Sequence, residues 1–390
     1  MISCKDLLSL NIFKYIKLVG GNGGIYKNVT WTYICETLDF SKWVNGGELI
    51  FITGMGISLN EESFKKLVLD CVNLDISGLI ILTNSEYINE IPISCIELAN
   101  ENNLPIFKMS WDIKLIDVTR EISNYIIERN FIKNKERELL KELLFSNKLN
   151  KDKIYKLIKY CSLNIRQVNL ISIFSLDDIK IDNLDCIINY IKLQLKKNNV
   201  EFLIDTFDKN ILCLLSIDEN DKNNIKSLLK SINEYINKYS MSTLSIGRGY
   251  KEIFDVENSY EDALNALGFY KYENSDIKNI DYDEIGFYKL LFNFEDIDNL
   301  KTYKDEVLGK LIEYDKNKNS NFTETLKMYL FHNSNLVNTA NKLFIHRNTL
   351  IYRMNKIKSI IDKDIEKPLI KNELINAIMI QDYLNYLENK

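Results

Sequence analysis

An uninterrupted helical pattern in the first half of the chain limits the folds that the chain can adopt. Residues 117–147 contain no Gly and no Pro, the two residues with the lowest helix propensity. The stretch predicts one long connector helix within residues 116–150. Its 4-3 spacing places apolar residues at six of eight positions, which are Val118, Ile122, Tyr125, Arg129, Ile132, Glu136, Leu139 and Leu143. Two interpretations stay open: a coiled-coil seam that pairs two subunits, or a connector packed on its own domains.

The region before the connector, residues 1–115, alternates strand and helix patterns. β-branched and apolar runs predict strands at residues 17–19, 29–34, 48–53, 78–83 and 105–109, with helices at 60–74 and 92–102. Nine of the fourteen Gly residues precede residue 80, as expected for a loop-rich α/β unit. We therefore expect an α/β domain with a mainly parallel sheet covered by helices.

The region after the connector divides near residue 283. Residues 151–283 combine strands at 168–174, 201–206, 211–216 and 243–247 with helices at 184–196, 224–239 and 256–272. Residues 207–210 separate the two middle strands, which predicts a β-hairpin. We expect an α+β domain whose sheet carries helices on one face. Residues 284–390 are predicted to be helical throughout.

Motifs for phosphates, metals and cofactors are missing from the sequence. The segment LVGGNGGIY at residues 18–26 lacks the Lys-Ser/Thr pair of a phosphate loop, so it predicts a glycine turn. The seven Cys form no CxxC pair and only two His occur, so we expect no metal site, disulfide framework or cofactor. The glycines around strand 48–53 predict turns by default. Alternatively, Glu48, Thr53 and Gly54 line an effector cleft at the end of that strand.

The charge of the chain is unevenly distributed. A formal net charge of −5 by itself argues against a nucleic-acid partner. However, residues 327–360 contain six Lys or Arg and no Asp or Glu, so this window carries +6 and the rest of the chain carries −11. The sequence therefore places a basic C-terminal module on an acidic body.

The basic window contains a helix-turn-helix pattern. A first helix, with Asn333 or Ser334 as its N-cap, has an apolar face formed by Leu336, Ala340 and Leu343. Residues 344–346 interrupt the pattern. A second helix begins near Arg347, and its inner stripe consists of Leu350, Met354, Ile357 and Ile361. The predicted fold class is multidomain α/β plus α+β, with an all-α C-terminal helix-turn-helix domain at residues 284–390.

The outer face of the second helix carries donors and cations without a carboxylate, which suits the major groove of double-stranded DNA. Its N-terminal residues are predicted to meet base edges, and residues further back to contact phosphates. The first group is Arg347, Asn348 and Thr349, and the second is Arg353, Lys356 and Lys342. Tyr352 shares this face, and His346 either caps the helix or contacts a phosphate. The alternative is a solvated helical hairpin.

The string His346-Arg347-Asn348-Thr349-Leu350, followed by Tyr352-Arg353, resembles the signature of the PucR family of bacterial transcriptional regulators. Glu48-Leu49 with Thr53-Gly54 resembles the family's N-terminal purine-catabolism domain. The region with Ile246-Gly247 is similar to the CdaR GGDEF-like domain. The resemblance implies a homodimer or higher oligomer whose N-terminal and middle domains sense a metabolite or relay a signal. One departure is Phe344, in the turn where helix-turn-helix proteins often place Gly.

The sequence therefore predicts an effector-responsive DNA-binding transcriptional regulator, an activator of a catabolic or nitrogen-assimilation operon. The alternative is a signalling enzyme or scaffold built on the GGDEF-like domain. No catalytic residue is expected, because the hairpin of that domain has no Gly and a single Asp208, while Asp177 and Asp178 predict a turn. Without a long apolar run or a secretory signal in MISCKDLLSLN, we expect a cytoplasmic protein without membrane contact.

Overall fold

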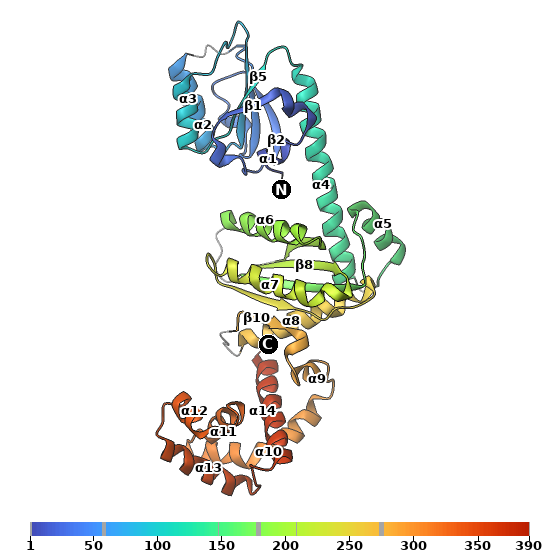
Figure 1. The fold of residues 1–390 in the computed structure, drawn as a ribbon, viewed down its shortest axis with the longest axis vertical. Helices are drawn as coiled ribbons and strands as arrows, with labels where there is room; N and C mark the ends of the chain where they lie inside the picture. The colour runs from blue at the N-terminus through green and yellow to red at the C-terminus, as the bar shows by residue number, and fades with distance from the viewer. Residues whose placement is uncertain are drawn as a thin grey trace. The chain divides into compact units, whose positions relative to one another are not determined.

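The computed structural model describes residues 2–56, 60–146, 148–176, 181–207, 209–272 and 277–389, without the side chains of residues 181–183. The chain divides into two compact units, Met1–Glu138 and Leu139–Lys390, each with its own buried cores (Figure 1). Asp177, Asp178 and Asp208, which the sequence analysis considered as metal-binding or turn residues, lie outside the described residues.

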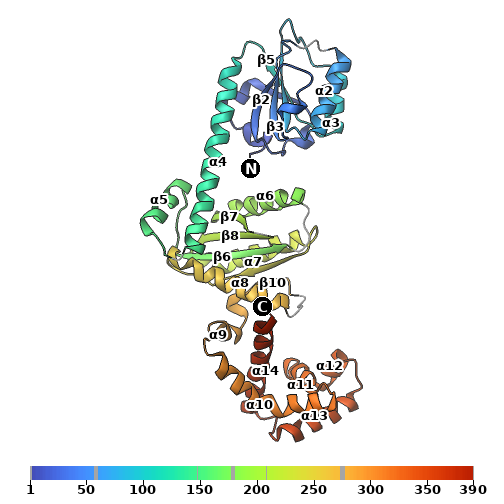
Figure 2. The ribbon, with the colours of Figure 1, turned by 180° about the vertical axis from the view of Figure 1, so that it is seen from behind.

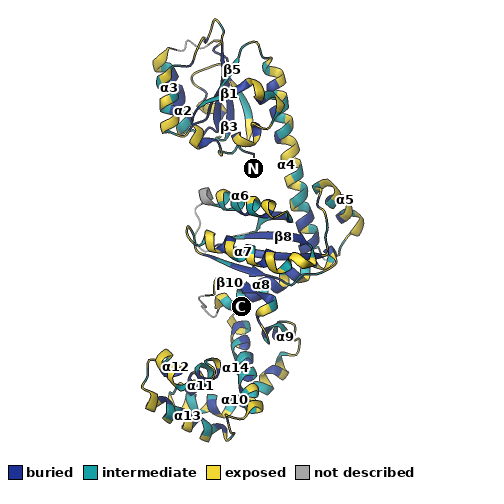
Figure 3. Cartoon of the chain, in the orientation of Figure 1, coloured by how far each residue is buried: buried dark blue, intermediate teal, exposed yellow. Residues whose placement is uncertain are grey.

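The first unit is built on a five-stranded sheet in the order β1-β5-β4-β3-β2. β1 pairs antiparallel with β5, and the other three pairings are parallel. The strands are β1 (Ile16–Gly20), β2 (Trp31–Cys35), β3 (Glu48–Ile52), β4 (Gly78–Thr83) and β5 (Ile106–Ser110). Every residue of β3 and β4 is buried, as expected for parallel strands covered on both faces (Figure 3). The predicted mainly parallel α/β sheet is confirmed.

Helices cover both faces of this first sheet. α2 (Glu61–Asn73) and α3 (Ile93–Glu101) pack on the face where Ile50 and Ile52 point. α1 (Cys4–Leu7) and the first part of α4 (Leu115–Phe145) pack on the face where Leu49 and Phe51 point. Alternate residues of β3 reach opposite cores because the side-chain period of a strand is two.

The predicted connector helix is α4. Near its start, Val118 and Ile122 belong to a core of the first unit, and near its end Leu139 and Leu143 belong to a core of the second. Between these stretches Ile127 is 53% exposed and Phe131 49% exposed. Both ends of α4 therefore pack on their own units, while a coiled coil along its middle stays a prediction.

The second unit is built on a five-stranded sheet in the order β10-β9-β6-β8-β7. β10 runs parallel to β9, and the other pairings are antiparallel. The hairpin predicted at residues 207–210 is confirmed, since Phe207 pairs with Asn210. The three-residue β10 was not predicted. The strands are β6 (Val168–Leu176), β7 (Glu201–Phe207), β8 (Asn210–Ile217), β9 (Ser242–Ile246) and β10 (Asn279–Asp281).

The prediction that this second sheet carries helices on one face is wrong. α6 (Ile181–Lys197) and α7 (Lys222–Ile236) cover one face, while α5 (Lys151–Cys161), α8 (Val256–Tyr272) and the end of α4 pack on the other (Figure 2). All nine residues of β6 are buried. Two of its polar side chains are bonded inside the protein and so do not mark a solvent face. Ser216 Oγ donates to Asn169 Oδ1 at 2.8 Å, and Lys271 Nζ donates to Ser175 Oγ at 2.7 Å.

The C-terminal region is helical, as predicted. Its helices are α9 (Tyr288–Phe292), α10 (Ile297–Lys318), α11 (Phe322–Phe331), α12 (Leu336–Lys342), α13 (Arg347–Ile361) and α14 (Pro368–Asn389). α14 contributes to two cores. Leu374 and Ala377 pack with α10–α13, whereas Tyr383 and Tyr386 pack with the middle region, where the Tyr386 ring lies 5.6 Å from that of Phe269. Within the described residues, no helix combines the length and the apolar character needed to cross a bilayer.

Candidate nucleic-acid interface

α12 and α13 form the predicted helix-turn-helix. Ala340 of α12 and Leu350, Met354 and Ile357 of α13 are buried in one core with α10, α11 and α14. The small Ala340 lets the two helices approach closely, and Leu350 fills the same core from the second helix. Asn335, rather than the predicted Asn333 or Ser334, caps α12, because its Oδ1 accepts from the amides of Val337 and Asn338 at 2.9 and 3.0 Å. Asn333 and Ser334 have positive φ and form the turn after α11 instead.

The turn between the two helices is a Schellman motif, the usual hydrogen-bonded end of a helix. The amide of Ile345 donates to the carbonyl of Ala340 at 3.0 Å, and the amide of Phe344 donates to that of Asn341 at 3.2 Å. Phe344 has φ +53°, the left-handed conformation that this motif requires. The predicted departure from Gly at this site therefore leaves the standard turn geometry intact.

His346 is the N-cap of α13, one of its two predicted roles, and its contact with a phosphate stays a prediction. The amide of Asn348 donates to His346 Nδ1 at 3.2 Å. The bond satisfies one of the helix's free N-terminal donors. It also fixes the direction in which α13 leaves the turn.

The first two turns of α13 present exposed side chains. Arg347, Asn348, Thr349 and Tyr352 are exposed, as is Lys342 at the end of α12. Among the described residues, neither Arg347 nor Lys342 has a carboxylate partner. Asn355 is exposed on the same helical face as Asn348 and Tyr352 and was not predicted. Its spacing of seven from Asn348, opposite the stripe of Leu350 and Met354, is the signal that could have found it.

Arg353 and Lys356 are half-buried and touch the helices behind α13. Arg353 Nη1 donates to Thr325 Oγ1 of α11 at 3.1 Å. The Lys356 ammonium lies 5.8 Å from the centre of the Tyr314 ring on α10. The structure thus separates these two cations from the exposed group at the start of the helix, and their phosphate contacts stay predictions.

The carboxylate of Asp315 stabilises the connection between α10 and α11, behind the candidate interface. Asp315, near the end of α10, accepts from Ser320 Oγ at 2.6 Å and from the amides of Phe322 and Thr323 at 2.8 Å each. Partial burial alone would raise the pKa of Asp315, but these hydrogen bonds outweigh it and hold the pKa below its usual value. Asp315 therefore caps α11 as a carboxylate and orients the helix that contacts Arg353.

The predicted effector residues are not brought together in the first unit. Glu48 begins β3, whereas Thr53 and Gly54 follow its end, about 16 Å away at 3.3 Å per residue. Both Glu48 oxygens are engaged, accepting from the amides of Asn45 at 2.9 Å and Gly46 at 3.0 Å. Glu48 thus holds the loop before β3.

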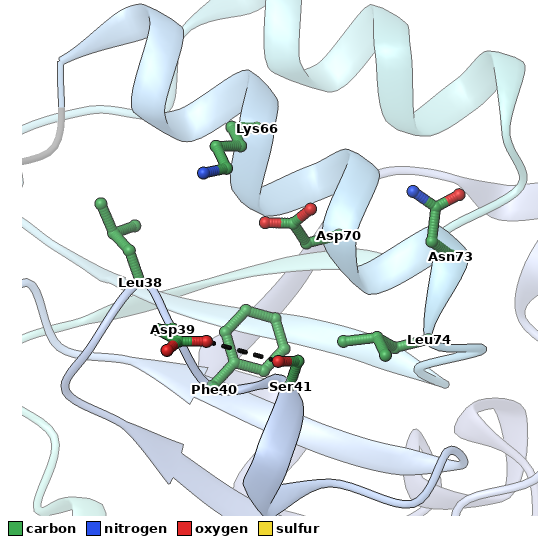
Figure 4. Close-up of a pocket in the computed structure, with 8 residues that line it drawn as sticks. All are labelled: Leu38, Asp39, Phe40, Ser41, Lys66, Asp70, Asn73 and Leu74. Atoms are coloured by element: carbon green, nitrogen blue, oxygen red, sulfur yellow. Dashed lines mark hydrogen bonds between the residues drawn. The ribbon is translucent and has the colours of Figure 1, made fainter.

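A cavity of about 380 Å³ lies elsewhere in this unit, between α2 and the loop that leads from β2 (Figure 4). Phe40, which is 1% exposed, lies at its base. Lys66, Asp70 and Asn73 project into it from α2, and within the described residues their side chains form no hydrogen bond or ion pair. The lining consists of Leu38, Asp39, Phe40, Ser41, Lys66, Asp70, Asn73 and Leu74.

The fold and this interface define a helix-turn-helix domain attached to an α/β unit and an α+β unit. Residues 6–126 match the purine catabolism regulatory protein-like family, and residues 322–372 match the PucR C-terminal helix-turn-helix domain. The chain is therefore similar to this family in these two regions, which cover its N-terminal α/β domain and its helix-turn-helix. The likeness of its middle region to the CdaR GGDEF-like domain stays a prediction.

Two individual proteins are similar to the chain. The DNA-binding transcriptional activator AdeR of Bacillus subtilis (strain 168) is 32% identical over 180 residues, which cover 45% of this chain and 43% of that protein. A crystal structure of a regulator of polyketide synthase expression from Bifidobacterium adolescentis is 17% identical, covering 63% of this chain and 91% of that one, with a TM-score of 0.32. At that TM-score the likeness does not define a shared fold.

Proposed function

We propose that this protein is an effector-responsive DNA-binding transcriptional regulator that activates a catabolic or nitrogen-assimilation operon. The observation that carries the proposal is the start of α13, where Arg347, Asn348 and Tyr352 are exposed on a recognition helix. The surrounding window of residues 327–360 carries +6 and no carboxylate. The name of the AdeR relative and the family matches support the same function.

Specificity and affinity fall to different side chains in this proposal. Arg347 reaches a guanine with its bidentate guanidinium, and Asn348 an adenine. Lys342 contacts a phosphate from the end of α12, while Arg353, held at one nitrogen by Thr325, keeps its other donors for a second phosphate. The acidic remainder of the chain opposes adhesion to DNA elsewhere on the surface.

A gel-shift titration of the full-length protein against its own upstream DNA tests this function. We expect the logarithm of the binding constant to fall linearly with the logarithm of salt, with a slope lowered by about 0.9 for each phosphate contact removed. Lys342→Ala should weaken binding to all sequences alike. Absence of binding at low salt, or unchanged binding after Arg347→Ala and Arg353→Ala, would refute the DNA-binding role.

The proposal includes a homodimer. Ile127 and Phe131 are exposed in the middle of α4 and lie four residues apart, the spacing of neighbours on one helical face. This face is opposite to the predicted seam of Arg129 and Ile132, so it offers a different dimer contact from that seam. Light scattering should find a dimer that Phe131→Glu dissociates, whereas Lys133→Glu, exposed on another face of α4, should leave it intact. A monomeric wild-type protein contradicts this part.

The cavity beside α2 supports a small-molecule effector. Its apolar base at Phe40 and its cationic, anionic and amide groups at Lys66, Asp70 and Asn73 suit a small polar ligand with donors and acceptors. Calorimetry of the full-length protein against purine breakdown products and amino acids should find one ligand. Lys66→Ala should weaken its binding. Lys65→Ala is the matched control, because Lys65 pairs with Glu61 outside the cavity.

The competing function is a signalling enzyme or scaffold built on the middle region. No group of three or more His, Cys, Asp or Glu suited to a metal ion occurs among the described residues. Incubation with GTP and Mg²⁺ that yields a cyclic dinucleotide would favour the enzyme. Salt-insensitive binding to a protein without DNA affinity would favour the scaffold.

A further inference from the structure

Phe344 combines two unfavourable features at the turn of the helix-turn-helix. Its side chain is 95% exposed, the highest value among the exposed large hydrophobic residues of the described chain. Its backbone has φ +53°, a conformation in which a Cβ atom crowds the following carbonyl oxygen. Neither feature contributes to the core beneath the turn, which Leu343 and Ile345 approach from either side.

The rest of the chain shows which residues this backbone conformation accepts. Ten described non-glycine residues have positive φ, and nine of them are Asn, Asp or Ser, whose short side chains tolerate the left-handed region. Phe344 is the exception to that pattern: Asp75, Asn84, Asn103, Ser162, Asn199, Asn319, Asn333, Ser334, Phe344 and Asp362. Folding alone would therefore be served better by Asn or Gly at residue 344, which directs attention to function.

The position of Phe344 indicates what its ring meets. It precedes the N-cap His346 by two residues and Arg347 by three, so its Cα lies within about 11 Å of that of Arg347. Cations and amides surround it, with Lys342 and Asn341 exposed at the end of α12 and no carboxylate anywhere in residues 327–360. If Phe344 entered an apolar pocket of a protein partner, the cations around it would lie at the rim of that pocket. The same cations attract DNA.

We propose that Phe344 is a specificity-determining residue that packs on the C5-methyl group of a thymine beside the base read by Arg347. The thymine methyl is the apolar group that a base pair offers in the major groove, and Phe is one of the side chains suited to it. This inference rests on the proposed DNA-binding function. It adds an apolar contact from the turn to the polar contacts of α13.

The test uses the full-length protein and a duplex selected by it from a random pool. Each thymine of the selected site is replaced in turn by deoxyuridine, which removes the methyl group alone. Wild-type affinity should fall about fourfold at one thymine per half-site, the effect of one buried methyl group. Phe344→Ala should bind the thymine duplex about fourfold more weakly than wild type does, and exchange of that thymine for deoxyuridine should not weaken the variant further. Phe344→Leu should keep part of the sensitivity to the methyl group.

A second readout separates function from folding. Phe344→Gly should relieve the backbone conformation and slow hydrogen exchange of the Ile345 amide by about threefold, while it weakens DNA binding. If Phe344 only supported the fold, a variant that gains protection of the Ile345 amide would not also lose DNA affinity. Equal deoxyuridine sensitivity in wild type and Phe344→Ala, or wild-type affinity in Phe344→Ala, overturns the inference while Arg347→Ala still reports on the DNA-binding function. Loss of a protein contact with unchanged DNA affinity would instead assign the ring to a protein partner.

Discussion

The two halves of α13 carry similar numbers of cations but use them differently. In the first half Arg347 is exposed beside Asn348 and Tyr352, with no carboxylate partner among the described residues. In the second half Lys356 lies over the Tyr314 ring, and Lys358 pairs with Glu366 at 3.4 Å. The difference shows that a basic window marks a DNA-binding region only coarsely. The side chains that remain without a partner define which part of it can reach the groove.

The largest expected effect is that of Arg347→Ala. Loss of a bidentate base contact should cost about 1–3 kcal/mol of binding free energy, which is about fivefold to 150-fold in affinity. The preference for one base pair should relax as well. Gel shifts against the selected duplex and single-base variants measure both effects. Circular dichroism should remain unchanged because Arg347 is exposed, and a wild-type preference in the variant would remove Arg347 from the reading face.

Asp315→Asn should act on stability rather than on contacts. The amide group cannot replace both charged oxygens as acceptors, so the unfolding free energy of the helical region should fall by about 1 kcal/mol, measured by hydrogen exchange of α11 amides. The pKa of Asp315 is lower in the folded protein, so its contribution is complete above the unfolded pKa of about 4 and is lost as pH falls through the folded value. Wild-type protection should therefore decline at acidic pH. A variant with the same acid-induced decline as wild type would show that Asp315 is not its source.

Thr325→Val tests the role of Arg353, which lies between the two halves of α13. The substitution removes the oxygen that accepts from Arg353 at 3.1 Å while nearly preserving shape. We expect DNA affinity to fall about twofold to threefold with an unchanged salt slope, because the guanidinium loses its position and keeps its charge. Arg353→Ala should lower the slope by about 0.9. Identical slopes in wild type and Arg353→Ala would place Arg353 entirely with the supporting helices.

The smallest effect is expected for Lys358→Ala. Its ammonium is engaged with Glu366 and lies at the far end of α13, so affinity should remain within about twofold of wild type. Salt-dependent gel shifts measure this directly. A drop comparable to that of Arg347→Ala would erase the distinction between the halves.

Local patterns in the sequence predicted most of the elements, and contacts between distant residues account for most of what they missed. α8 and β4 begin and end where their periodicity and flanking residues indicate. The N-cap of α12 was misplaced because Asn333, Ser334 and Asn335 are three consecutive capping residues, and the fold alone selects among them. β10 was missed because three residues carry too short a pattern.

In the candidate interface, too, local patterns predicted some features and missed the contacts between distant residues. The helix-turn-helix and its exposed Arg347 could be predicted from spacing and charge. The bond from Arg353 to Thr325 spans 28 positions, and no local pattern reveals it. The cavity beside α2 combines two segments whose approach depends on the sheet, so no local pattern in the sequence indicates it.

Because α14 contributes to two cores, it affects how the chain folds during its synthesis. The core of the middle region, which includes Phe269 and the end of α4, is completed by Tyr383 and Tyr386. The ribosome has therefore made the whole helix-turn-helix segment before that earlier core can close. A nascent chain interrupted before residue 374 exposes apolar surface at two places at once, in the middle core and in the core that Leu374 completes. Truncated copies should thus be targets for chaperones and proteases instead of half-functional regulators.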